Sequence, residues 1–131
     1  MSQSRLGTIR LNIFMLIFIQ LDSKRADTVF AMLRDGGFTK NQSKILAMLE
    51  QVSDVGLPEL TLYLGMSSSR ASESLKTLLR TGYIMAMDVK YVMGKGRSRR
   101  IYRLKMPIEE ILSDSRRRVA VMITYRNNID P

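Results

Sequence analysis

The chain has 131 residues, a length typical of one domain, and 45% of them are hydrophobic, which is enough to build a packed core. Its 21 Lys and Arg residues exceed its 12 Asp and Glu residues, and the net charge of +9 favours a polyanionic partner, nucleic acid before an acidic membrane surface. Cys and His are both absent, which excludes disulfides, thiol chemistry, zinc sites built from Cys and His, and histidine-based catalysis. We therefore expect no metal, no cofactor and no enzymatic activity.

The positive charge is concentrated in one third of the chain. Residues 66–106 hold ten basic and two acidic residues, a net charge of +8, whereas residues 1–65 have a net charge of +1 and residues 107–131 are neutral. Basic residues that serve only solubility would be spread more evenly along the chain. We therefore expect residues 66–106 to present an anion-binding face.

Residues 9–21 form the most apolar stretch of the chain. Its odd-numbered positions are all apolar, as in a strand, but further apolar residues on the other face leave a helix equally open. Arg5 and Arg10 before it imitate a signal peptide, yet the stretch is too short to span a bilayer and no cleavage site follows. We expect a cytoplasmic protein in which this segment is buried or dimerising; a translation start at Met15 or Met32 is the other interpretation.

Two helices are predicted next. Apolar residues recur at helical spacing over 22–35, and Gly36 and Gly37 are suited to a left-handed C-terminal cap. Thr39 and Gln42 have the spacing of a capping box, in which each side chain accepts a hydrogen bond from the other residue's backbone N–H. This pair predicts the start of the second helix.

A turn at residues 54–56 leads into a short helix that ends at Leu64, because Pro58 suits the first helical position, where its missing N–H costs nothing. After a tight turn, a longer helix is predicted over about 67–81, with serines able to cap its start. Its buried stripe consists of Ala71, Leu75, Leu78 and Leu79. Its opposite face carries Arg70, Glu73, Lys76, Thr77 and Arg80.

Two strands and a last helix complete the chain. Residues 83–93 are rich in β-branched and aromatic types and predict a strand, and residues 100–105 alternate as the returning strand. The turn at 94–99 contains two glycines and is dense in basic residues. A helical stripe begins after Pro107, but residues 119–125 are also typical of a strand, which leaves the end of this helix open.

The order helix, short helix, tight turn, helix and hairpin is that of a winged helix-turn-helix. The segment GMSSSRASESLKTLLRTGYI, residues 65–84, resembles the recognition-helix segment of MarR-type and TrmB-type transcription regulators. GFTKNQSKILAMLE, residues 37–50, resembles the entry to the TrmB-type DNA-binding domain, and the basic wing followed by Ile-Tyr-Arg-Leu strengthens the likeness.

The resemblance covers residues 36–106. It implies a mainly α fold with a small β-hairpin (α+β) and a sequence-specific, usually dimeric, double-stranded DNA-binding transcription regulator of a bacterial or archaeal cell. Sugar-sensing TrmB-type proteins carry a large C-terminal effector domain, whereas 25 residues follow the wing here, so we do not expect sugar sensing.

The candidate DNA-binding residues lie on the third helix and on the wing, residues 94–100. A helix of this kind fits the major groove, and a compact basic loop fits the phosphate backbone or the minor groove. Arg70 and Lys76 would read base edges, while the wing residues would contact the backbone. The full set is Ser67, Ser68, Ser69, Arg70, Lys76, Thr77, Lys95, Arg97, Arg99 and Arg100. The plainer alternatives are that the serines serve only as helix caps and that the basic residues are ordinary solvated side chains.

Three parts of the chain are expected: an N-terminal arm and helix at 1–35, the DNA-binding domain at 36–106 and a C-terminal helix at 107–131. The two flanking parts are apolar and nearly neutral, so we expect them to hold a homodimer through one patch on both subunits. The residues predicted at this interface are Ile13, Phe14, Ile17, Phe18, Ile111, Leu112, Val119, Met122 and Ile123. Three alternatives remain: the flanks cover their own subunit, the flanks pair with each other as terminal strands, or the winged helix is a protein–protein interaction module of the transcription machinery. The sequence does not define a small-molecule effector.

Overall fold

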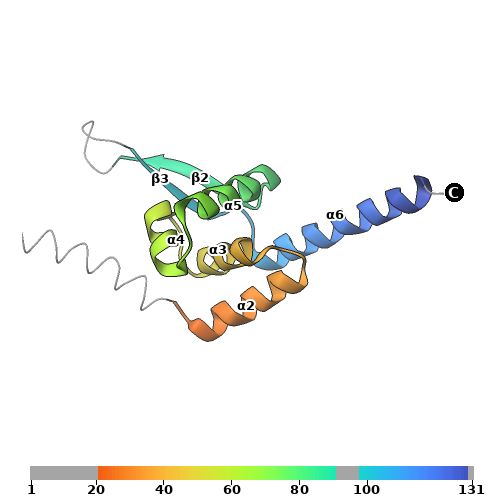
Figure 1. Cartoon of the computed structure of the whole chain (residues 1–131), viewed down its shortest axis with the longest axis horizontal. Helices are drawn as coiled ribbons and strands as arrows, with labels where there is room; N and C mark the ends of the chain where they lie inside the picture. The colour runs from red at the N-terminus through yellow and green to blue at the C-terminus, as the bar shows by residue number, and fades with distance from the viewer. Residues whose placement is uncertain (1–20, 91–97, 130–131) are drawn as a thin grey trace, which may run out of the picture.

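A computed structural model describes residues 21–90 and 98–129 of the chain (Figure 1). The apolar arm at 9–20 and the predicted wing residues Lys95 and Arg97 lie outside the described residues. The elements are helices α2 (Ser23–Asp35), α3 (Lys40–Gln51), α4 (Leu57–Leu64), α5 (Ser68–Thr81) and α6 (Ile108–Ile129), and strands β1 (Val55–Gly56), β2 (Ile84–Val89) and β3 (Arg99–Leu104). This is the winged helix-turn-helix order predicted from the sequence.

The local signals explain where the helices begin and end. The capping box at α3 is formed, with the backbone N–H of Gln42 donating to Thr39 Oγ1 and that of Thr39 donating to Gln42 Oε1, both at 3.1 Å. Ser67 caps α5 by accepting from the backbone N–H of Arg70 at 3.3 Å. The left-handed residue after α2 is Gly37, with φ +96°, while Gly36 stays in the right-handed region.

The three strands form one antiparallel sheet in the order β1-β3-β2. In the hairpin, Ile84 pairs with Leu104 and Val89 with Arg99. The sequence predicts only a turn at residues 54–56, and this is wrong for Val55 and Gly56, which form β1 and pair with Tyr102 and Ile101 of β3. A strand of two residues is too short to show a period, and it exists because β3 supplies its hydrogen-bonding partner.

The core surrounds α3, which packs against α2, α4, α5 and β3. Its residues Ile45 and Leu46 are fully buried, together with Leu33 of α2 and Leu75 of α5. An ion pair of 2.7 Å between Arg25 Nη2 and Glu50 Oε1 further joins α2 to α3. Helix α5 therefore packs against an apolar core centred on α3.

Helix α6 is buried at its start and exposed at its end. Its first turns insert Ile108, Ile111 and Leu112 into the core. The prediction that Ile111 and Leu112 lie at a dimer interface is therefore wrong, because they are buried against their own subunit. The helix continues through the stretch that also suited a strand, and its second half projects away from the body of the molecule (Figure 1).

In the described ranges, no helix combines the length and the apolar character needed to cross a membrane. The same ranges hold no group of three or more acidic residues placed to bind a metal ion.

Candidate nucleic-acid interface

Helix α5 presents a cationic face to solvent. Ala71, Leu75 and Leu78 anchor its opposite face in the core. By helical geometry, Lys76 and Arg80 lie opposite this buried stripe and Arg70 lies at its edge. All three side chains are exposed, and within residues 21–90 and 98–129 none of them forms an ion pair. Their charges are therefore available to an external anion.

The start of α5 is built from small polar residues. Ser67, Ser68 and Ser69 are all exposed, and Ser67 is occupied as the cap of the helix. Small side chains allow another backbone to approach, and the first-turn N–H groups carry the positive end of the helix dipole. The hydroxyl of Thr77 donates to the carbonyl of Glu73 at 3.3 Å, which leaves its lone pairs as acceptors. The start of α5 is therefore suited to a phosphate, and Thr77 in the second half of the helix is suited to a base edge.

The hairpin lies beside α5 (Figure 1). Its strand β3 sends alternate side chains to opposite faces. Arg100 is exposed, with its guanidinium carbon 6.0 Å from the centroid of the Tyr102 ring. Arg99 and Arg103 lie on the other face, where Arg103 Nη2 pairs with Asp54 Oδ1 at 2.7 Å. Asp54 has the left-handed φ of +65°, which is uncommon for a residue other than glycine.

Arg99 is placed differently from the exposed Arg100. Its guanidinium pairs with the carboxylate of Glu59 on α4, a side chain that is only 7% exposed. Gly56 makes room for this pair, because a Cβ at that position would lie 2.9 Å from Arg99 Nε and 3.0 Å from Glu59 Oε2. Burial lowers the pKa of Arg99, but a guanidinium remains charged at neutral pH. The pair therefore ties the base of the wing to α4.

Sequence reasoning missed Glu59, Gly56 and Asp54. The signal for Glu59 is present, since it is a lone acidic residue among the apolar side chains of LPELTLYL, and a buried carboxylate needs a partner. That partner is 40 residues away in the chain, so the sequence alone does not identify it.

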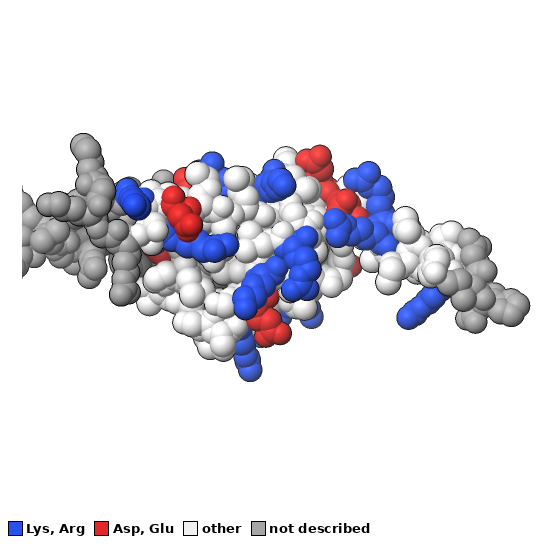
Figure 2. Space-filling model, turned by 90° about the horizontal axis from the view of Figure 1, so that it is seen from above, with Lys and Arg blue, Asp and Glu red and all other residues white. Residues whose placement is uncertain are grey.

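The surface charge is unevenly distributed between the body of the molecule and the projecting end of α6. Viewed from the side of α5 and the hairpin, the body of the molecule carries several Lys and Arg side chains, with some Asp and Glu side chains among them (Figure 2). The projecting end of α6 is almost uncharged. The exposed basic side chains are thus gathered on the body of the molecule, whereas the projecting end of α6 exposes mostly large apolar side chains.

No family model matches the chain, and no curated protein does either. Among solved structures, the transcriptional regulator Tm0710 from Thermotoga maritima is similar over 94% of this chain and 80% of its own, with a TM-score of 0.51 and 19% sequence identity. Rv0081 from Mycobacterium tuberculosis is similar over 73% of this chain and 90% of its own, with a TM-score of 0.48 and 26% sequence identity. A MarR/EmrR family transcriptional regulator from Acinetobacter sp. ADP1 is similar over 97% of this chain and 82% of its own, with a TM-score of 0.47 and 16% sequence identity. The likeness to Tm0710 is one of fold, and the predicted winged-helix fold is confirmed.

Proposed function

We propose that the chain is a sequence-specific, double-stranded DNA-binding transcription regulator that acts as a homodimer. One observation carries the proposal: α5 exposes three basic side chains without ion pairs in the described part of the chain, next to a hairpin that is itself basic. A helix with this surface fits the major groove in width and in charge. The fold likeness to a transcriptional regulator agrees with it.

In this proposal α5 reads bases. Arg70 and Lys76 donate to acceptors such as guanine O6 and N7, and Ser68, Ser69 and Thr77 allow close approach and add hydrogen bonds. Ser67 contributes by capping the helix through the N–H of Arg70, while other N–H groups of the first turn face the DNA backbone in this proposal. Arg80, at the far end of the same face, is an additional phosphate contact.

The wing has two roles in this proposal. Lys95, Arg97 and Arg100 bind phosphates or the minor groove, which fixes the position of α5 on the duplex. Arg99 holds the wing in place through Glu59, and it adds a positive charge near the backbone. The DNA-binding unit is thus the predicted domain at 36–106.

The exposed end of α6 provides the dimer contact in this proposal. Exposed apolar patches on a protein mark contact surfaces, and a two-fold interface uses the same patch on both subunits. The large apolar side chains exposed there are Val119, Val121, Met122, Ile123 and Tyr125. Residues 1–20, predicted to join this contact, lie outside the described residues and stay a prediction. Two joined subunits would present two recognition helices to one duplex.

Binding to duplex DNA as a function of salt concentration tests the proposal. Phosphate contacts release counterions, so the logarithm of affinity should fall steeply and linearly with the logarithm of salt concentration. If the chain is instead a protein–protein interaction module, we expect no salt-dependent binding to duplex DNA. Affinity that is absent at low salt, or that does not change with salt, would remove the proposal.

A further inference from the structure

A cluster of polar contacts connects the end of α5 to α6. Tyr83 follows α5 immediately after Gly82, and its ring is only 3% exposed. Its hydroxyl donates to Asp114 Oδ2 on α6 at 2.7 Å. Tyr83 also contacts Phe38 ring to edge, with centroids 5.7 Å apart, so its position is set by the core. Asp114 is thereby held at a fixed point relative to α5.

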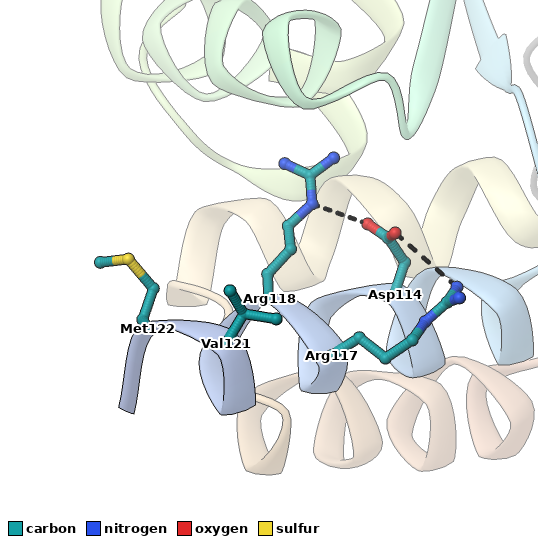
Figure 3. Close-up of a pocket in the computed structure, with 5 residues that line it drawn as sticks. All are labelled: Asp114, Arg117, Arg118, Val121 and Met122. Carbon is teal, nitrogen blue, oxygen red and sulfur yellow. Dashed lines mark hydrogen bonds and ion pairs between the residues drawn. The ribbon is translucent and has the colours of Figure 1, made fainter. Parts of the chain in front are cut away.

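Arg118, one turn further along α6, makes a second link to the same place. Its Nε donates to Asp114 Oδ2 at 2.9 Å, and its Nη2 donates to the carbonyl of Thr81, the last residue of α5, at 3.2 Å. Its guanidinium carbon lies 5.4 Å from the centroid of the Tyr83 ring. Figure 3 shows Asp114 between the guanidinium groups of Arg118 and Arg117. Arg117 is the weaker partner, at 3.8 Å and largely exposed.

This cluster lies at the point where α6 leaves the body. The apolar residues of α6 before it, Ile108, Ile111 and Leu112, are buried in the core, and large apolar side chains beyond it are exposed. On the other side of the helix, Leu112 lies against Gly36, where an added Cβ would come within 2.9 Å of Leu112 Cδ2. Close apolar packing therefore holds the start of α6, while hydrogen bonds of defined direction hold the turn from which it projects.

We propose that Asp114 is a positioning residue that sets the direction in which α6 leaves the DNA-binding domain, and with it the spacing between the two recognition helices of the dimer. The inference rests on the proposed function, since it assigns the projecting helix to the dimer contact.

The geometry makes the spacing sensitive to this joint. From Asp114 to Tyr125 the helix runs for about 16 Å at 1.5 Å per residue. A change of roughly 10° in its direction moves the far end by about 3 Å, which is close to the rise of one base pair. Hydrogen bonds from Tyr83 and Arg118 lower the pKa of Asp114, so the carboxylate that receives them stays ionised at neutral pH.

The first test measures the joint inside one subunit, without DNA. The chain has no Cys, so Arg80→Cys and Arg126→Cys place one spin label on α5 and one on the projecting part of α6. Labelled protein is diluted with unlabelled protein so that each dimer holds one labelled chain. In this background, Tyr83→Phe and Arg118→Gln should broaden or shift the distance between the labels. Arg117→Gln is the matched control, with the same charge change on the neighbouring residue, and should leave it unchanged.

The second test uses Tyr83→Phe, Arg118→Gln and Arg117→Gln without labels, on palindromic duplexes whose half-site separation varies by single base pairs. Wild type and Arg117→Gln should prefer one spacing by tenfold or more, whereas the other two should bind neighbouring spacings within about threefold of the best. An unchanged label distance, or an unchanged spacing preference in variants that still bind, overturns the inference. If wild type binds no palindrome while the label distance responds as expected, the proposed function fails and the joint itself stands.

Discussion

Arg99 of β3 and Glu59 of α4 form an ion pair that joins two parts of the winged-helix fold 40 residues apart in the chain. Glu59 is almost fully buried, whereas Arg99 is about one third exposed. The pair therefore compensates the buried negative charge of Glu59, which its apolar surroundings would otherwise disfavour. It also fixes the position at which strand β3 begins.

Glu59→Gln should weaken both folding and DNA binding. The variant removes the negative charge that Glu59 places beside the partly buried Arg99, which should reduce the free energy of unfolding by roughly 1–3 kcal/mol after allowing for solvent at Arg99. Urea denaturation measures this loss. Binding should fall for all duplexes alike, because the wing is less well held. Tighter binding in Glu59→Gln would instead show that the pair withholds Arg99 from DNA.

The two classes of predicted DNA contacts should separate on substitution. Arg70→Ala should reduce discrimination at one base pair by about 1–3 kcal/mol, because a base-edge contact is lost. Arg100→Ala should weaken all duplexes similarly and lower the salt slope by about 1, because one phosphate contact is lost. Fluorescence anisotropy with a set of single-base-pair variants of the preferred duplex measures both. A uniform loss with Arg70→Ala would assign that residue to the backbone.

Met122→Asp should dissociate the dimer. Met122 is 68% exposed on the projecting part of α6, so a carboxylate there costs the single subunit little but would be buried in the dimer contact. Light scattering should give twice the chain mass of 15.0 kDa for wild type and the chain mass for the variant. Asn127→Asp, which adds the same charge further along the helix, is the control and should remain dimeric. A wild-type mass of one chain would contradict the dimer.

Tyr83 should titrate at unusually high pH. Burial first, and then the hydrogen bond to Asp114, raise its pKa from 10.0 to about 12. The folded protein therefore holds this proton more tightly than the unfolded chain does. The resulting stabilisation is complete below pH 10 and is lost as the pH rises from about 10 to 12, with a total on the order of 3 kcal/mol.

A titration of tyrosinate absorbance, with the wild-type curve compared with that of Tyr83→Phe, isolates this group. The difference should show one phenol ionising near pH 12. The pH dependence of unfolding should be flatter above pH 10 in Tyr83→Phe than in wild type. A difference curve centred at pH 10 would mean that the hydroxyl is exposed to water and does not reach Asp114.

Local patterns predicted most of the fold. The capping box of Thr39 and Gln42, the cap at Ser67 and the alternation in the two hairpin strands are each encoded within a few neighbouring residues. Features that depend on distant parts of the chain were missed. Strand β1 exists only against β3, and the ion pair of Glu59 depends on a residue that the fold brings to it.

The C-terminal helix shows the same contrast between features set by local sequence and features set by distant contacts. Its apolar stripe predicts a helix but does not show which part of the stripe meets the core. Ile111 and Leu112 are buried in their own subunit, and Met122 and Ile123 are not. The change from buried to exposed falls where Asp114 and Arg118 of α6 contact Tyr83 and Thr81, residues that are distant in the chain.

Selection of bound sequences from a random pool of duplexes, followed by sequencing, tests the central claim most directly. We expect wild-type protein to enrich one palindromic motif whose half-sites lie about one helical turn apart. The double variant Arg70→Ala and Lys76→Ala should lose the motif while retaining salt-dependent binding through the wing. Failure of the wild-type protein to enrich any motif, or enrichment of the same motif by the double variant, would contradict sequence recognition by α5.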